Sequence, residues 1–283
     1  MNAIEVQNLT KNYSGFSLSN IGFVLPEGSI LGLIGENGAG KTTTIKLIMN
    51  AVNRDEGTVR VLGVDNQDSA FYDVKDDVGV VLDEAYFPEV LTAKQVGGIM
   101  RRTYRNWDED CYQRYLEKLS LPESKAFKEF SRGMKMKLAI AVALSHDPKL
   151  LILDEATSGL DPIVRDEILD IFNDFTRDET HSILLSSHIV SDLEKICDYI
   201  AFIHKGKLVL CEEKDRLLDE FAVVGLPADE FRLLPHGTVL GYKKNDYGVE
   251  ALMRRSNLPK ATKAERTTLE NIILFLVKGE NEQ

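Results

Sequence analysis

Residues 35–42 constrain this chain more than any other segment, because they read Gly-Glu-Asn-Gly-Ala-Gly-Lys-Thr between a predicted strand and a predicted helix. The apolar run 30–34 precedes them, and a helical pattern over 43–50 follows. Glycines let backbone N–H groups close around anionic oxygens, and the start of the following helix adds partial positive charge. The motif in this context predicts a phosphate-binding loop in a parallel α/β sheet.

Two side chains of this loop have the chemistry needed to hold a nucleotide and its metal ion. Lys41 is predicted to reach the terminal phosphates, and the Thr42 hydroxyl to bind a Mg²⁺ that bridges the last two phosphates. The other predicted members of the phosphate cradle are Gly35, Asn37, Gly38, Ala39, Gly40 and Thr43. The loop by itself indicates a nucleotide and leaves open which nucleotide is bound and to what end.

Two acids follow a second buried strand. Residues 150–153 read Leu-Leu-Ile-Leu, which is typical of a central strand in a parallel sheet covered on both faces, and Asp154 and Glu155 come next. Ligands of such sheets lie beyond the carboxyl ends of the strands. We therefore expect Asp154 to bind Mg²⁺ directly or in its second shell, and Glu155 to act as the base that orients a water for attack on the γ-phosphate.

Further motifs follow in order along the chain. Residues 131–134 open a helical run over 135–144, residues 158–161 read Ser-Gly-Leu-Asp, and an apolar strand over 183–186 is followed by His188. Together with the phosphate loop and the acids, these motifs resemble in order and spacing the nucleotide-binding subunit of an ATP-binding cassette (ABC) transporter. The resemblance extends over roughly residues 3–212.

The resemblance implies roles for five more residues. Tyr13 matches the aromatic residue on which the family stacks adenine. Ser131 and Gly133 match the signature segment, which caps the γ-phosphate of the ATP held by the opposite subunit. A serine hydroxyl and backbone N–H groups at a helix N-terminus are suitable anion ligands. Asp161 matches the aspartate of the loop that crosses the dimer interface, and His188 matches the histidine that contacts the γ-phosphate.

Two segments depart from the family pattern. The usual signature is Leu-Ser-Gly-Gly-Gln, whereas residues 130–134 read Phe-Ser-Arg-Gly-Met, similar to the exporter branch called ABC-2 transporters, which moves peptides, lipids and antibiotics. The family also ends the strand at 78–82 with a glutamine that binds Mg²⁺, and here Asp83 or Glu84 takes that place. A carboxylate binds Mg²⁺ more strongly than an amide but adds negative charge beside the phosphates. Asp83 is therefore a predicted metal ligand.

The fold implied by the resemblance is a P-loop (RecA-like) α/β core with an ABC-type antiparallel β-subdomain, in a nucleotide-binding domain over residues 1–212. A mostly helical pattern over about 88–146 matches the family's helical subdomain, with its clearest helices over 107–119 and 135–144. The aromatics Tyr86 and Phe87 at its junction with the core suit a docking groove for a membrane partner and equally suit a core.

Residues 213–283 are predicted to form a small C-terminal α+β extension. Its expected elements are helices over 212–221, 247–255 and 268–278 and a strand over 237–244. The basic stretch 260–266 is interpreted as a solvated face.

Composition excludes several other classes of protein. No stretch approaches the ~18 to 20 apolar residues needed to cross a bilayer, and residues 1–7 lack the basic start of a secretory signal. The net charge of −11 argues against a nucleic-acid partner. The three cysteines, Cys111, Cys197 and Cys211, lack metal-type spacing and are expected to be reduced thiols of a cytoplasmic protein.

With the resemblance, these features predict an ATPase that uses ATP and Mg²⁺ to power export through separate membrane subunits. We expect it on the inner face of the cell membrane, as a homodimer or a heterodimer with a second nucleotide-binding subunit. Two alternatives remain open, namely a soluble ABC ATPase of an assembly or repair machine and a regulatory ATP-binding module with weak hydrolysis. The transported substrate is not encoded in this chain, because the membrane subunits recognise cargo.

Overall fold

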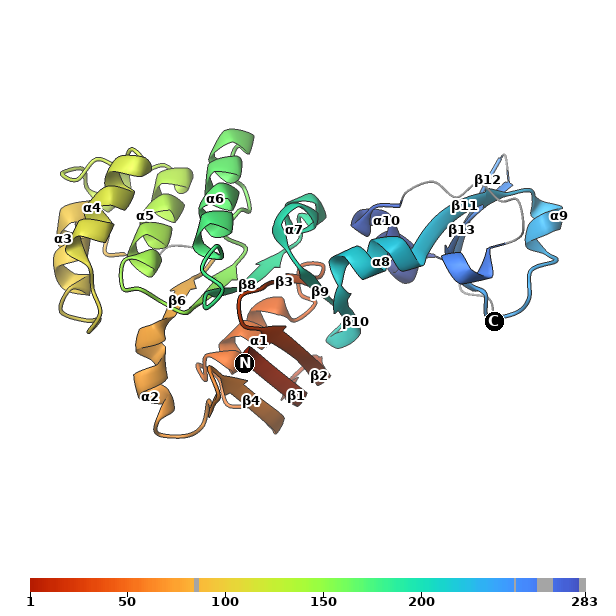
Figure 1. Ribbon diagram of the computed structural model, residues 1–283, viewed down its shortest axis with the longest axis horizontal. Helices are drawn as coiled ribbons and strands as arrows, with labels where there is room; N and C mark the ends of the chain where they lie inside the picture. The colour runs from red at the N-terminus through yellow and green to blue at the C-terminus, as the bar shows by residue number, and fades with distance from the viewer. Residues whose placement is uncertain (84–86, 247, 259–266, 280–283) are drawn as a thin grey trace. The chain divides into compact units, whose positions relative to one another are not determined.

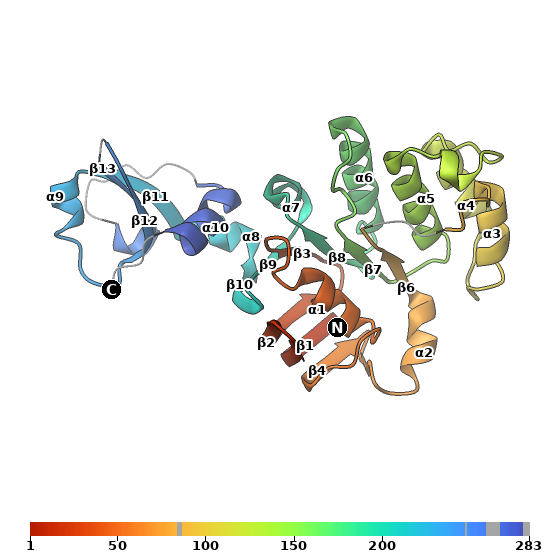
Figure 2. The same ribbon diagram turned by 180° about the vertical axis from the view of Figure 1, so that it is seen from behind.

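The computed structural model describes residues 1–83, 87–246, 248–258 and 267–279. The chain divides into two compact units, Met1–Leu210 and Cys211–Gln283, and their elements are shown in Figure 1 and, from behind, in Figure 2. Within the described ranges, none of the helices combines the length and the apolar character needed to cross a membrane.

Parallel strands form the centre of the first unit. In spatial order they are β9 (Tyr199–His204), β3 (Ile30–Ile34), β8 (Ser182–Ser187), β7 (Leu150–Asp154) and β6 (Val78–Val81). Every residue of β3, β7 and β8 is buried, as expected for strands covered on both faces. Ile34 pairs with Ser187, and Asp154 pairs with Ser186. The segments that follow these three strands therefore begin at the same edge of the sheet.

The same sheet continues beyond β9 in the order β10 (Lys207–Glu213), β2 (Phe16–Pro26), β1 (Asn2–Tyr13), β4 (Glu56–Val61) and β5 (Val64–Asp65). β10 pairs with β2 in parallel, whereas the neighbours among β2, β1, β4 and β5 pair antiparallel. Strands β1 and β2 form a hairpin in which Tyr13 pairs with Phe16 next to the turn. This part of the sheet corresponds to the antiparallel β-subdomain predicted from the resemblance, so the fold class is confirmed.

Helices leave the carboxyl edge of the parallel strands. α1 (Lys41–Ile48) follows β3, α6 (Pro162–Phe175) follows β7, and α7 (Val190–Ile196) follows β8. After the short α2 (Phe71–Val74) and β6, the chain inserts α3 (Ala93–Met100), α4 (Glu109–Lys118) and α5 (Arg132–Leu144), which lie side by side in Figures 1 and 2. The predicted helices at 107–119 and 135–144 are thus found with shifted ends, because Asp108 and Ser131 cap α4 and α5.

The second unit has a three-stranded antiparallel sheet. Its strands, in spatial order, are β11 (Phe221–Leu226), β13 (Gly248–Arg254) and β12 (Val239–Asn245). The helices are α8 (Lys214–Glu220), α9 (Ala228–Phe231) and α10 (Leu269–Lys278). α8 confirms the helix expected over 212–221, α10 confirms the helix expected over 268–278, and β12 confirms the strand expected over 237–244. The observed ends of these elements differ from the expected ends by no more than two residues. The basic stretch 260–266 lies outside the described residues.

The helix expected over 247–255 is wrong, because residues 248–254 form the central strand β13. Val249, Ala251 and Met253 enter the core while Glu250 and Arg254 are exposed, which is the period of two that a strand requires. Leu252 is buried on the other face of the sheet, and that apolar residue interrupts the alternation in the sequence. Pairing with both β11 and β12 overrides the local helical pattern.

Candidate active site

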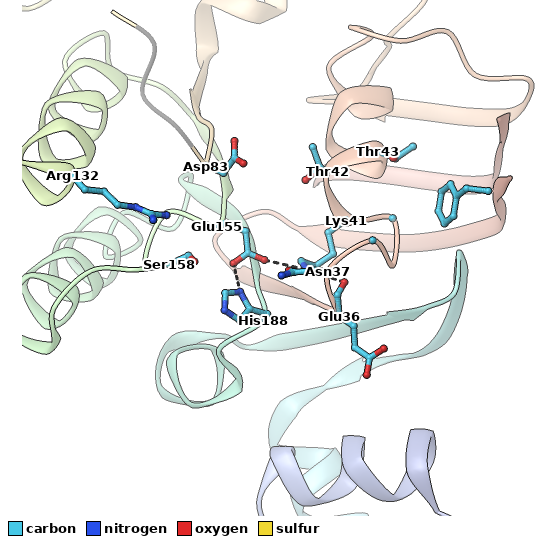
Figure 3. A pocket seen from close by; sticks show the side chains of 13 residues that line it. Glu36, Asn37, Lys41, Thr42, Thr43, Asp83, Arg132, Glu155, Ser158 and His188 are labelled. Carbon is cyan, nitrogen blue, oxygen red and sulfur yellow. Dashed lines mark hydrogen bonds and ion pairs between the residues drawn. The ribbon is translucent and has the colours of Figure 1, made fainter. Parts of the chain in front are cut away.

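A cavity of about 660 Å³ opens where the segments after β3, β7 and β8 meet (Figure 3). The phosphate loop and the start of α1 supply the largest part of its lining, namely Glu36, Asn37, Gly38, Gly40, Lys41, Thr42 and Thr43. The remaining lining residues are Phe16, Asp83, Arg132, Glu155, Ser158 and His188. Segments far apart in the sequence therefore face one cavity.

The loop before α1 approaches its neighbours so closely that two positions require glycine. Gly40, with φ of +117°, leaves room for no side chain, because a Cβ atom there would lie 2.7 Å from Leu18 Cδ1. At Gly35 a Cβ atom would lie 2.6 Å from the carbonyl oxygen of Ile203. Gly35 and Ala39 support the loop from beneath and are not part of the cavity lining. The first N–H groups of α1 have no partners within the helix and are suited to bind an anion.

Lys41, Glu155 and His188 form a connected chain of charged and polar groups in the cavity (Figure 3). Lys41 is buried, and its Nζ donates to the carbonyl oxygen of Gly35 at 2.7 Å and lies 3.0 Å from Glu155 Oε1. The second carboxylate oxygen, Glu155 Oε2, lies 2.6 Å from His188 Nδ1. The two predicted catalytic residues are therefore in contact, and both face the predicted phosphate loop.

The backbone at Glu155 turns sharply as the chain leaves β7. Its φ of +53° lies in the left-handed region, which a non-glycine residue adopts only when its surroundings hold it there. Its N–H donates to the carbonyl oxygen and the hydroxyl of Ser186 on β8, at 3.1 and 3.2 Å. These bonds fix the turn that directs the carboxylate into the cavity.

Asp154 lies fully buried below the cavity and is not part of its lining. Its Oδ1 accepts a hydrogen bond from the Ser186 hydroxyl, whereas Oδ2 has no hydrogen-bond partner among the described residues. Burial of a carboxylate oxygen without a donor is unfavourable, so the atom is suited to a cation or to a water held by one. Thr42 and Asp83 line the cavity, and together with Asp154 they offer only oxygen donors, which is the kind of donor that Mg²⁺ prefers. Glu84, the alternative to Asp83, lies outside the described residues.

The aromatic residue in the cavity lining is Phe16, not Tyr13. Its Cζ would lie 3.2 Å from a Cβ atom built on Gly40, which places the ring against the phosphate loop. Tyr13 is 45% exposed, and Lys11 Nζ lies 5.8 Å from its ring centroid. Phe16 was not among the residues predicted from the sequence, although it is an aromatic residue only three positions from Tyr13, which was a usable signal.

The three remaining predicted residues stand at helix starts outside the cavity lining. Ser131 caps α5, and its hydroxyl accepts from the N–H of Met134 at 3.3 Å, while Gly133 lies in the first turn of that helix. Asp161 caps α6 by accepting from the N–H groups of Ile163 and Val164. Of this signature segment, only Arg132 faces the cavity, and the sequence analysis had assigned it no role.

Comparison with known proteins gives the family context. The ABC transporter family matches residues 18–158. The chain is 36% identical over 209 residues to the bacitracin transport ATP-binding protein BcrA of Enterococcus faecalis, covering 73% of this chain and 68% of that protein. It is 35% identical over 215 residues to the lantibiotic transport ATP-binding protein SrtF of Streptococcus pyogenes, covering 75% of this chain and 91% of that protein.

A solved structure described as the ATP-binding subunit of an ABC transporter superposes with a TM-score of 0.69 at 29% identity, covering 76% of this chain and 91% of the other. This likeness confirms the mixed α/β fold expected from the sequence.

Proposed function

The chain belongs to the ABC transporter family, and from this premise we propose that it is the ATP-hydrolysing subunit of a bacterial ABC-2 type exporter for a peptide, antibiotic or lipid. Two relatives that are named for bacitracin transport and lantibiotic transport support this class of cargo. The observation that carries the chemistry is the contact of Lys41, Glu155 and His188 in one cavity beside the phosphate loop.

In the proposed reaction, Glu155 is the general base and His188 holds it in place. ATP phosphates that bind Lys41 compete with the Glu155 carboxylate for the ammonium group, which lies 3.0 Å away. Once Lys41 has turned to the phosphates, Glu155 is free to accept a hydrogen bond from water and to orient it toward the γ-phosphate. His188 contacts the other carboxylate oxygen and, in this proposal, would contact the γ-phosphate as well.

We assign Mg²⁺ to Thr42, Asp154 and Asp83, with Asp154 acting directly or through a water. The ion supplies positive charge to the β- and γ-phosphate oxygens when it is bound. Tyr13 and Phe16 are the two candidates for stacking on the nucleotide base. The loop residues Gly35, Asn37, Gly38, Ala39, Gly40 and Thr43 form or support the phosphate cradle.

The subunit is proposed to work as a dimer at the inner face of the membrane, bound to separate membrane subunits. Ser131 and Gly133 of one subunit would cap the terminal phosphate of the other subunit's ATP, and Asp161 would cross the interface. Residues 1–212 would form the nucleotide-binding domain and residues 213–283 an accessory domain. Phe87 and the residues after it would contribute to docking of the membrane subunit, while Tyr86 lies outside the described residues.

Affinity purification from membranes of the native host tests this proposal. We expect the wild-type chain and Glu155→Gln to recover the same multi-span membrane protein, and only the wild type to hydrolyse ATP with Mg²⁺. Recovery of a soluble assembly or repair complex in place of a membrane protein would favour the first alternative. Recovery of the membrane protein with no ATPase activity would favour the regulatory module.

A further inference from the structure

Arg132 differs from the other basic residues of the cavity in its charge environment. Glu155 contacts both Lys41 and His188. Among the described residues, by contrast, no carboxylate forms an ion pair with Arg132, which is exposed and lines the cavity. Among the residues that the structure describes, the Arg132 guanidinium therefore has no carboxylate partner to neutralise its charge.

The exposed Arg132 side chain packs against the backbone of one glycine. A Cβ atom built on Gly159 would lie 2.7 Å from Arg132 Nη1 and 2.8 Å from its Cζ, so the guanidinium rests directly on the Gly159 backbone. Gly159 has φ of +68° and belongs to the turn that leads from Glu155 to Asp161. Figure 3 shows Arg132 reaching from α5 toward Ser158, on the side of the cavity opposite the phosphate loop.

This placement favours a phosphate as the ligand of Arg132. A guanidinium offers several donors in a fixed plane, a geometry that matches phosphate oxygens, and packing on Gly159 reduces the side-chain entropy lost on binding. Ser131 and Gly133, the two residues proposed to cap a terminal phosphate, are its neighbours in the chain. An arginine that meets charge on a transferred phosphate stabilises the transition state more than the ground state.

Resting on the proposed function, we propose that Arg132 is a phosphate-binding residue of the ATPase cycle, whose guanidinium contacts the terminal phosphate of ATP. That phosphate belongs either to the nucleotide in the same chain or to the nucleotide of a second copy. In both cases the arginine distinguishes ATP from ADP, because ADP lacks the group that it contacts.

The test uses the full chain with Glu155→Gln as the parent, so that ATP persists during the measurement. Arg132→Gln keeps the length needed to pack on Gly159 and removes the charge, while Arg132→Lys keeps the charge and loses the planar fork. The matched control is Arg102→Gln, an exposed arginine just after α3 in the same helical insertion and outside the cavity lining. Circular dichroism melts check that each variant is folded.

ATP and ADP affinities are measured by calorimetry on dilute protein, and ATP-dependent dimerisation is measured by sedimentation. We expect Arg132→Gln to weaken the ATP-dependent step by about 10- to 100-fold, the range for one hydrogen bond to a charged group, with ADP affinity unchanged. For Arg132→Lys, the ATP affinity or ATP-dependent dimerisation should lie between the values of Arg132→Gln and the parent. Loss of ATP affinity in the monomer assigns the contact to the same chain's nucleotide, whereas loss only in dimerisation assigns it to the partner's.

Two results would overturn the inference. One is an Arg132→Gln variant that matches the parent in both measurements, and the other is an equal loss of ATP and ADP affinity, which would mean that Arg132 acts through packing alone. A parent that binds no ATP would contradict the proposed function itself, so the two failures are distinguishable.

Discussion

Lys41 and Glu155 form an ion pair between two parts of the chain that are 114 residues apart, with Nζ 3.0 Å from Oε1 and side chains only 5% and 13% exposed. Charges this well buried are stable only when they are paired. In the proposed reaction, the ATP phosphates would replace Glu155 as the partner of the Lys41 ammonium, and the attacking water would then bind to the Glu155 carboxylate. The proposal therefore couples ATP binding to activation of the base through this ion pair.

Glu155→Gln should lower ATP hydrolysis by roughly 10²- to 10⁴-fold, the loss expected for removal of a general base. ATP binding should be kept or tightened, because the amide no longer competes with phosphates for Lys41. Phosphate release and calorimetric titration measure the two effects, and in ATP this variant should run as a dimer on size exclusion. Glu36→Gln, which changes another acid of the cavity lining, is the control. Hydrolysis at the wild-type rate in Glu155→Gln would exclude it as the base.

Lys41→Ala should abolish measurable ATP affinity, because it removes the only lysine among the described residues of the cavity lining and leaves Glu155 Oε1 without a cation beside the phosphates. Lys46→Ala is the matched control, since Lys46 is exposed on the same helix α1. Unchanged affinity of Lys41→Ala in a calorimetric titration would contradict the assignment of the loop.

The phosphate loop and the two acids could be predicted from sequence because their signals are local. In each case a fully buried strand leads directly into the functional residues: β3 ends just before the phosphate loop, Asp154 is the last residue of β7, and Glu155 follows it. Contacts between distant segments could not be predicted in this way. The packing of Arg132 on Gly159 depends on how the helical insertion meets the turn after β7, which no local pattern specifies.

Sequence alone also could not show whether Tyr13 or Phe16 faces the cavity, although the two residues are only three positions apart. Both aromatics stand next to one hairpin turn, and the register that pairs them places one ring by the phosphate loop and leaves the other 45% exposed. For β13, the local pattern was misleading because burial on both faces hides the period of a strand.

Phe16→Ala should raise the KM for ATP by about 5- to 150-fold, since loss of stacking on a base is worth roughly 1 to 3 kcal/mol. Tyr13→Ala should have a smaller effect, because only Phe16 contacts Gly40 and lines the cavity. Steady-state ATPase assays measure both variants. A larger effect at Tyr13 would return the stacking role to that residue.

His146 should make the free energy of unfolding depend on pH below about 6.5. Its ring is fully buried and stacks on Tyr104 with centroids 3.9 Å apart, and burial lowers its pKa below the usual 6.5 although Asp76 and Asp147 act in the opposite direction. The folded state then binds fewer protons than the unfolded state as pH falls below 6.5. Stability is therefore full above that pH and is lost on acidification, by at most about 1.4 kcal/mol per pH unit.

Urea unfolding of wild type and His146→Phe between pH 5 and 7.5 measures this contribution. Phenylalanine keeps the stacked ring on Tyr104 and cannot titrate, so the slope below pH 6.5 should be smaller in the variant. His236→Phe, at an exposed position of the second unit, should leave the slope unchanged. Equal slopes for wild type and His146→Phe would show that His146 does not carry the effect.

Asp83→Asn should raise the Mg²⁺ concentration needed for half-maximal ATPase activity, by about 10- to 100-fold, the range found when a group that supports a metal site is lost. The reason is its position, since Asp83 follows β6 and lines the cavity that also contains Thr42. A carboxylate there attracts the ion and repels phosphates that lack one, whereas an amide binds Mg²⁺ more weakly and carries no charge to repel phosphates. Asp77→Asn, at the opposite end of β6, is the control.

Stimulation by reconstituted membrane subunits should also weaken in Asp83→Asn. The reason comes from the resemblance, which implies that the family glutamine at this place couples the metal to the membrane partner. Should the Mg²⁺ titrations of Asp83→Asn and wild type superimpose and the stimulation be equal, Asp83 is a solvated acid, and Glu84 becomes the next residue to substitute.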